Sequence, residues 1–138
     1  QEYEDTYEVA PARREGGERR ETLRDAARQE LGMRRVMDQG GYFLESISGV
    51  DWLEAQQLEV VYDYNRLGGE HCRVMVRTRI PRENPELPTI SGVFPAADWH
   101  ERETFDFYGV IFAGHPNLIR ILLPEDADFF PLRKDYLP

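Results

Sequence analysis

The sequence predicts an α+β fold in a single domain, with a mixed or antiparallel sheet, helices packed on it and an extended, proline-punctuated C-terminal tail. Three observations lead to this prediction: two runs of alternating apolar residues flank a glycine doublet, a helical pattern follows them, and prolines recur towards the C-terminus. A chain of 138 residues, 41% of them hydrophobic, can build one core. We expect residues 1–92 to form a core of helix and sheet, and residues 93–138 to form a second helix and the tail.

The N-terminal part of the chain predicts a strand, a helix and a second strand. Residues 7–10, which Pro11 closes, favour a short strand. Apolar residues recur at helical spacing in residues 18–31, which predicts an amphipathic helix. An aromatic and apolar run at residues 42–47, which follows a glycine doublet, predicts another strand.

The clearest pattern in the sequence predicts an antiparallel hairpin. Apolar side chains alternate with others in residues 58–64, and residues 72–80 repeat this period of two against arginines. Gly68-Gly69 between the runs can adopt positive φ at a tight reversal. We therefore expect the hairpin at the centre of a mixed sheet, with the 18–31 helix packed on one face. Cys72 is expected to be an inert residue of the core.

The C-terminal half predicts a connector, a helix and a tail. Residues 81–88 contain three prolines and no periodicity, which indicates a connector leading away from the sheet. Residues 95–108 favour a helix that Gly109 ends. Because prolines interrupt residues 110–138, we expect this tail to bury few apolar side chains against its own domain, to be partly disordered alone, and to bind a partner. A tail that wraps its own domain is the alternative.

Composition and charge narrow the class of function. The net charge of −9 offers no basic excess for phosphates, so we expect no nucleic-acid partner. A single cysteine excludes an internal disulfide and cannot supply the thiolates of an iron–sulfur cluster, which fits a reducing cytoplasm. No apolar run approaches the roughly 20 residues of a membrane span, and no secretory signal is visible at the start, so we expect no direct membrane insertion.

The sequence contains no pattern that predicts a metal, cofactor or catalytic site. His100-Glu101 resembles the start of an HExxH zinc motif, but Thr104 stands where the second histidine is needed. The glycine doublets match neither GxGxxG nor a P-loop, so we expect no bound NADH. We therefore expect no cofactor, no metal ligand and no catalytic residue in this chain.

Residues 99–108 combine several charges with aromatic residues. Arg102 and Asp106 are four residues apart on the predicted helix and can pair with each other, which leaves Glu101 and Glu103 free for partners. One interpretation is a helix held by its own ion pairs, and the other is a semi-buried charge network at a contact between subunits. A catalytic pair of Glu101 and Glu103 is disfavoured because the two residues do not share a helix face.

The segment from Trp99 to Tyr136 contains a nearly continuous string of residues at fixed spacings. They are Glu101-Arg102-Glu103, Asp106, Tyr108-Gly109-Val110, Phe112, Gly114-His115-Pro116, Leu118, Arg120-Ile121-Leu122, Pro124-Glu125-Asp126 and Pro131-Leu132-Arg133-Lys134-Asp135-Tyr136. This string resembles the signature of a subunit family of NADH-quinone oxidoreductase (respiratory complex I), namely its C-type or 30 kDa subunit. The upstream order of one helix, Gly49-Val50-Asp51, a hairpin and the proline-rich residues 84–89 resembles the family more loosely.

This chain departs from the pattern of the family at Ile119, Ala127, Phe129 and Phe130. An alternative parent is therefore an energy-converting membrane-bound [NiFe] hydrogenase or formate hydrogenlyase complex, which contains a related subunit. A free-standing adaptor also stays open.

The resemblance implies a non-catalytic subunit of the peripheral arm that holds no cofactor. It would position the electron-transferring subunits, on the cytoplasmic side of the cell membrane. Its implied partners are the D-type subunit or the hydrogenase large subunit, together with the cluster-bearing subunits of the same complex. The expected partner-binding residues are Glu101, Arg102, Glu103, Asp106, His115, Arg120, Asp126, Arg133, Lys134 and Asp135.

Overall fold

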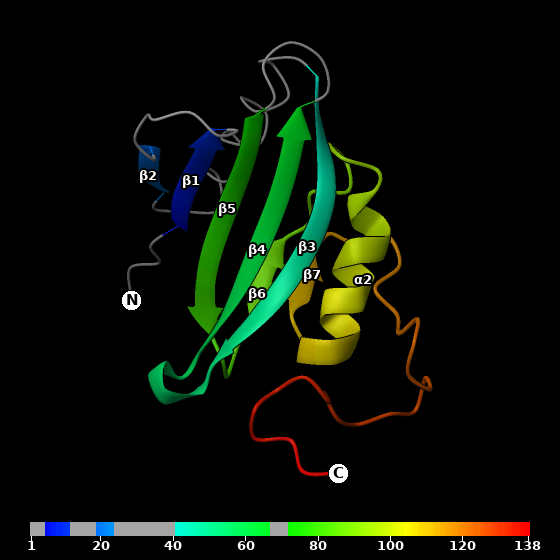
Figure 1. The fold of residues 1–138 in the computed structure, drawn as a ribbon. Coiled ribbons are helices and arrows are strands. Elements are labelled where there is room, and N and C mark those ends of the chain that lie inside the picture. Colours follow the sequence, from blue (N-terminus) through cyan, green and yellow to red (C-terminus); the bar gives the residue numbers. More distant parts are fainter. Residues whose placement is uncertain (1–4, 12–18, 24–40, 67–71) are drawn as a thin grey trace.

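A five-stranded antiparallel sheet is the main element of the fold (Figure 1). The structure is a computed structural model that describes residues 5–11, 19–23, 41–66 and 72–138. The strand order is β2-β1-β5-β4-β3. The strands are β1 (Asp5–Pro11), β2 (Arg19–Leu23), β3 (Tyr42–Trp52), β4 (Gln57–Arg66) and β5 (Cys72–Pro81).

The predicted hairpin is confirmed as β4 and β5, which pair antiparallel with Leu58 opposite Ile80 and Tyr62 opposite Val76. This register places the alternating apolar side chains of both strands on one face. All five strands are antiparallel, which is one of the two predicted arrangements, and β5 lies in the middle of the sheet, so the hairpin is central as predicted. The glycine reversal and the side chain of Cys72 lie outside the described residues.

The helix predicted for residues 18–31 is wrong over Arg19–Leu23, which form β2. The predicted strand at residues 7–10 lies within β1, and β2 pairs antiparallel with it, Val9 opposite Arg19. The helical spacing rests on Leu23, Ala26, Ala27 and Leu31 of the sequence. Only Leu23 falls in this segment, so a helix would gain little burial there, whereas pairing with β1 satisfies the backbone. The rest of the predicted helix lies outside the described residues.

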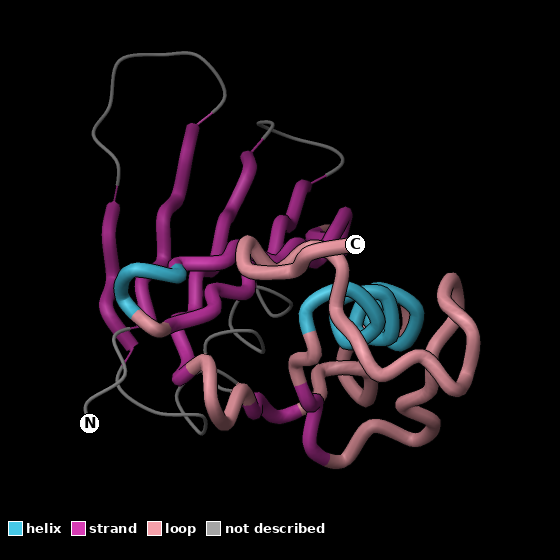
Figure 2. Tube along the Cα trace, turned by 90° about the horizontal axis from the view of Figure 1, so that it is seen from below, coloured by secondary structure: helices cyan, strands magenta, loops and turns pink. Residues whose placement is uncertain are grey.

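The helix that covers the sheet is α2 (Ala97–Tyr108), which packs against β3. Figure 2 shows α2 on one side of the sheet. The predicted helix at residues 95–108 is thus confirmed, with its start two residues later. Gly109 ends it with φ of 78°, and its N–H donates to the Phe105 carbonyl at 2.8 Å. No helix in the described part of the chain is long and apolar enough to cross a membrane.

Two short strands, β6 (Glu86–Pro88) and β7 (Ile111–Ala113), form a separate parallel pair. The predicted connector therefore contains a strand, which three residues are too few to reveal by periodicity. The remaining element is the one-turn 3₁₀ helix η1 (Leu53–Ala55). After β7 the chain continues without regular structure and passes below the lower end of α2 (Figure 1, orange to red).

The core lies between the sheet, α2 and the β6–β7 pair. Tyr62 and Tyr64 of β4 are fully buried, and the Tyr64 ring packs on Phe94 with the centroids 5.0 Å apart. Burying one such large side chain contributes about 1.5–3 kcal/mol. The other buried apolar residues are Leu44, Ile47, Leu58, Val60, Val61, Val74, Val76, Ile80, Leu87, Ile90, Ala97, Val110 and Phe112.

The opposite face of β4 carries buried charges. Asp63 is bound by Arg73, and this hydrogen bond raises the pKa of Arg73. Glu59 accepts a hydrogen bond from Trp52 Nε1 at 3.1 Å and lies 3.7 and 3.8 Å from Arg77 and Arg79. Burial therefore extends to both faces of this strand, although the alternating pattern predicts only one buried face.

Candidate functional site

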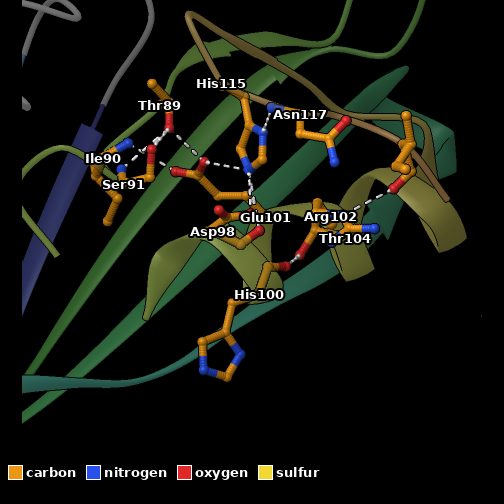
Figure 3. A network of polar contacts seen from close by, with 11 residues as sticks. Thr89, Ile90, Ser91, Asp98, His100, Glu101, Arg102, Thr104, His115 and Asn117 are labelled. Atoms are coloured by element: carbon orange, nitrogen blue, oxygen red, sulfur yellow. Dashed lines mark hydrogen bonds and ion pairs between the residues drawn. The ribbon is translucent and has the colours of Figure 1, made fainter. Parts of the chain in front are cut away.

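Glu101 of α2 is fully buried and ties the helix to the segment that follows β6 (Figure 3). Its Oε1 accepts the N–H of Ile90 at 2.7 Å, and its Oε2 accepts the hydroxyl of Thr89 at 2.6 Å. Burial raises the pKa of Glu101, although these two hydrogen bonds favour the ionised form. The side chain therefore acts as an internal tie between α2 and the 89–91 turn.

His115 extends this network to the loop after β7. Its side chain is fully buried, with Nε2 3.1 Å from the Asp98 carbonyl and 3.8 Å from Glu101 Oε2. Nδ1 accepts the N–H of Asn117 at 3.0 Å, which places the ring proton on Nε2, where it donates to Asp98. His100 points away from this network (Figure 3). Among the described residues, no three side chains of the metal-binding types stand together as a metal site.

Asp106, also fully buried, binds the loop at residues 120–123. Its Oδ2 accepts the N–H groups of Ile121, Leu122 and Leu123 at 3.2, 2.7 and 3.0 Å. Its Oδ1 accepts Nη1 of Arg120 at 2.9 Å. Burial opposes ionisation, but the N–H donors and the guanidinium outweigh it and lower the pKa of Asp106.

A third network fixes the end of the chain. Buried Arg82 binds Asp51 at 3.0 Å and Asp135 at 2.5 Å. The N–H of Lys134 donates to Asp51 at 2.7 Å, and Arg133 donates to the Tyr108 carbonyl at 2.7 Å.

Electrostatic effects accompany these contacts. Burial lowers the pKa of Arg133, and the Arg82 charge adds to this effect. Burial likewise raises the pKa of Tyr108, with a further contribution from the Asp51 carboxylate.

The ten predicted partner-binding residues therefore divide by exposure. Glu101, Arg102 and Asp106 are buried, as are the side chains of His115 and Arg120. Arg133 is half-buried. The exposed members are Glu103, Asp126, Lys134 and Asp135.

Two expectations about the helix are wrong. Arg102 does not pair with Asp106, because it lies over the Trp99 ring at 4.6 Å and donates to the Ile119 carbonyl at 3.2 Å. Glu101 is not free for a partner, since it is buried and hydrogen-bonded within the chain.

The tail also makes polar contacts with its own domain that the sequence did not predict. Asp106 binds it at residues 120–123, and Asp51 binds it at Lys134. The expectations that the tail is partly disordered when the chain is alone and that it binds a partner stay predictions.

Sequence reasoning missed Asp51, Arg82 and Thr89 as site residues. Asp51 and Thr89 fall in segments that resemble the family, but no local spacing connects them to the residues that they bind. Arg82 lies 53 residues before Asp135. One signal for Arg82 was available in the sequence: it is an arginine in the proline-rich connector, directly after the strand predicted at residues 72–80.

Comparison with known proteins shows the family of the chain. Residues 21–138 match the family model described as the respiratory-chain NADH dehydrogenase 30 kDa subunit. The C-type subunit of NADH-quinone oxidoreductase from Salinispora tropica is 48% identical over 93 residues, which are 66% of this chain and 38% of the relative. The same subunit from Roseiflexus castenholzii is 44% identical over 95 residues, covering 68% and 54%. The chain thus spans less than two thirds of the length of these relatives.

Two solved structures have the same fold. The trypsin-resistant fragment (1–134) of Nqo5 is 30% identical with a TM-score of 0.64, covering 81% of this chain and 89% of that one. A chain of the membrane-bound sulfane sulfur reductase, an archaeal respiratory membrane complex, is 28% identical with a TM-score of 0.72, covering 93% and 76%. The family resemblance seen in the sequence is confirmed. The chain belongs to the family of the 30 kDa subunit of respiratory-chain NADH dehydrogenase, which is the C-type subunit of NADH-quinone oxidoreductase.

Proposed function

We propose that this chain is a non-catalytic subunit of the peripheral arm of an NADH:quinone oxidoreductase, where it docks onto the electron-transferring subunits and positions them. One observation carries the proposal: the charged residues of the signature segment bind their own chain. Glu101, Asp106 and Arg120 are buried and hydrogen-bonded within it. Buried groups that are hydrogen-bonded within the chain hold its loops in place and are not positioned to exchange protons with a substrate.

The same geometry argues against Glu101 and Glu103 as an acid and a base. The Glu101 carboxylate is enclosed by Thr89 and Ile90, whereas Glu103 is exposed on the helix. The two groups therefore do not face one common substrate position.

The proposed partners are a D-type subunit and the cluster-bearing subunits, on the cytoplasmic side of the membrane. The four exposed members of the predicted set, namely Glu103, Asp126, Lys134 and Asp135, would meet the partner directly. The buried members would act as positioning residues that fix the loops on which the exposed ones stand.

The second candidate is the equivalent subunit of a membrane-bound [NiFe] hydrogenase or formate hydrogenlyase complex. The similarity to a chain of the sulfane sulfur reductase supports it, because that protein is a respiratory membrane complex of another kind. Both candidates assign the same docking role to this chain, and they differ in the identity of the large partner.

Purification of the tagged chain from membranes of its own host tests the proposal. Recovery of a D-type subunit with cluster-bearing chains is the expected result. Recovery of a [NiFe] large subunit would favour the second candidate, and recovery of the chain alone would overturn both. An assembly variant sharpens the test: Lys134→Glu should lower recovery of the partners, whereas the exposed control Glu83→Lys should not.

A further inference from the structure

A groove of about 490 Å³ lies between α2 and the loops after β7. Its apolar part consists of Phe105, Leu118, Ile119 and Phe130, and its acidic part of Glu125 and Asp128. We call it the Phe130 groove. Since one water occupies about 30 Å³ in the liquid, the groove has room for large side chains. Ile119 is 43% exposed there, so apolar surface faces solvent.

The apolar part of the Phe130 groove is held in a fixed shape. The rings of Phe105 and Phe130 meet edge to face with the centroids 6.4 Å apart. The guanidinium groups of Arg120 and Arg133 each lie 5.0 Å from the centroid of the Phe130 ring. Both cations are fixed by backbone carbonyls, those of Phe129 and Tyr108 respectively. The surface is therefore rigid enough to select a partner by shape.

The acidic part of the groove is electrostatically unbalanced. Glu125, Asp126 and Asp128 are exposed, and none of them makes an ion pair or hydrogen bond within the described part of the chain. The only cation that lines the groove, among the described residues, is Arg120, whose charge is compensated by Asp106 at 2.9 Å. The side of the rim formed by Glu125, Asp126 and Asp128 therefore carries three exposed negative charges, which favour a cationic group on the occupant.

We infer that the Phe130 groove receives a segment of a partner subunit that carries one bulky apolar side chain with a lysine or arginine close to it. The apolar side chain lies on Phe105, Ile119 and Phe130, and the cation pairs with Glu125 or Asp128. This inference rests on the proposed docking function and names the chemistry of the partner. A second copy of the chain is a poor occupant, because each copy has a net charge of −9.

Photo-crosslinking in the assembled complex tests which molecule occupies the groove. The full chain carries p-benzoylphenylalanine in place of Ile119, is expressed in its host and is irradiated before purification. The expected product joins this chain to one partner subunit, at a position within a few residues of a lysine or arginine. A product with a second copy, with a small molecule, or no product in an assembled complex would overturn the inference.

Charge reversal tests the chemistry. The double variant Glu125→Lys, Asp128→Lys is compared with the control Glu54→Lys, Glu83→Lys, which makes the same charge change at exposed positions outside the groove. We expect the groove variant to lower the amount of co-purified partner at least about fivefold at low salt, and the loss to shrink at high salt because exposed charges are screened. Equal recovery for the two double variants would overturn the inference.

Two measurements separate the possible failures. A thermal melt of each variant shows whether its fold is intact, and the change is expected to stay within about 0.5 kcal/mol because the positions are exposed. If the unsubstituted chain recovers no redox partner, the proposed function fails. If it recovers its partners while the groove variant behaves like the control, only the inference about the groove fails.

Discussion

Replacement of Asp106 by asparagine tests the network that joins α2 to the chain after β7. The carboxylate accepts three backbone N–H groups and one guanidinium N–H, and its side chain has no exposed surface. An asparagine side chain has one acceptor oxygen. If that oxygen stays with the three N–H groups, the amide nitrogen faces Nη1 of Arg120, and two donors meet.

The structure sets the magnitude of the effect. Breaking a buried ion pair costs about 3–5 kcal/mol, and Arg120 keeps hydrogen bonds to the carbonyls of Asp106 and Phe129, which favours the low end. We therefore expect a loss of about 3 kcal/mol in the free energy of unfolding. For a chain of this size one kcal/mol corresponds to about 3 °C, so the melting temperature should fall by about 10 °C.

Urea denaturation of the purified chain at pH 7, followed by circular dichroism, measures the loss. Glu103→Gln is the matched control, because this acid is exposed on the same helix and should change stability by less than about 0.5 kcal/mol.

Acid provides a second check on Asp106. Because the pKa of Asp106 is lowered in the folded state, its stabilisation is present above the unfolded pKa of about 3.9 and is lost as the pH falls through the folded pKa. The difference between wild type and Asp106→Asn should therefore shrink in acid. A loss below about 1 kcal/mol at pH 7 would refute the reasoning.

Three further substitutions test other contacts. Gly49→Ala should cost about 1–3 kcal/mol in a urea titration, because its Cβ would stand 2.4 Å from the Tyr108 ring, and an unchanged midpoint would contradict that packing. Glu101→Gln should lose less stability than wild type between pH 4 and pH 7. Burial raises the pKa of Glu101 in the folded state, so wild type loses folding stability as the pH rises above the unfolded pKa of about 4.3. Equal pH profiles of stability for wild type and variant would refute this direction. Asp51→Ala should cost about 3 kcal/mol by leaving buried Arg82 without one of its two carboxylates, and it should speed hydrogen exchange at the Lys134 amide, where an unchanged rate would count against the network.

The elements predicted well from the sequence are those whose signals are local. The alternation in β4 and β5 is visible in consecutive residues because both strands bury one apolar face on the same core. The end of α2 is equally predictable, since Gly109 adopts a positive φ that other residues rarely take. The family resemblance comes from spacings within one segment.

The parts predicted poorly depend on contacts between distant residues. Helical spacing favours a helix over residues 18–31 as a whole, but pairing with β1 decides the conformation of residues 19–23. Asp106 has the spacing of a partner for Arg102 one turn away, whereas its donors lie 14 to 17 residues along the chain. Helical spacing indicates which side chains can meet on a helix, and it carries no information about loops that return to cover it.

The proline-rich tail shows the same limitation. Its lack of periodic residues predicts a segment that buries few apolar side chains against its own domain. Its anchors are instead polar and backbone groups, such as the N–H groups of residues 121–123 and of Lys134, which no hydrophobic pattern reveals. The absence of a pattern therefore indicates irregular structure correctly, but it carries no information about polar contacts.

The two carboxylates that hold this segment, Asp106 near its start and Asp51 near its end, have a consequence for the thermodynamics of association. A segment tethered at both ends has already lost most of its conformational entropy when the chain folds. The proposed docking of this segment would therefore require little further ordering, and more of the contact energy would be available as affinity than for a tail that folds on its target. Calorimetry of the association should then show a heat-capacity change set by the contact area alone, without the additional signature of coupled folding.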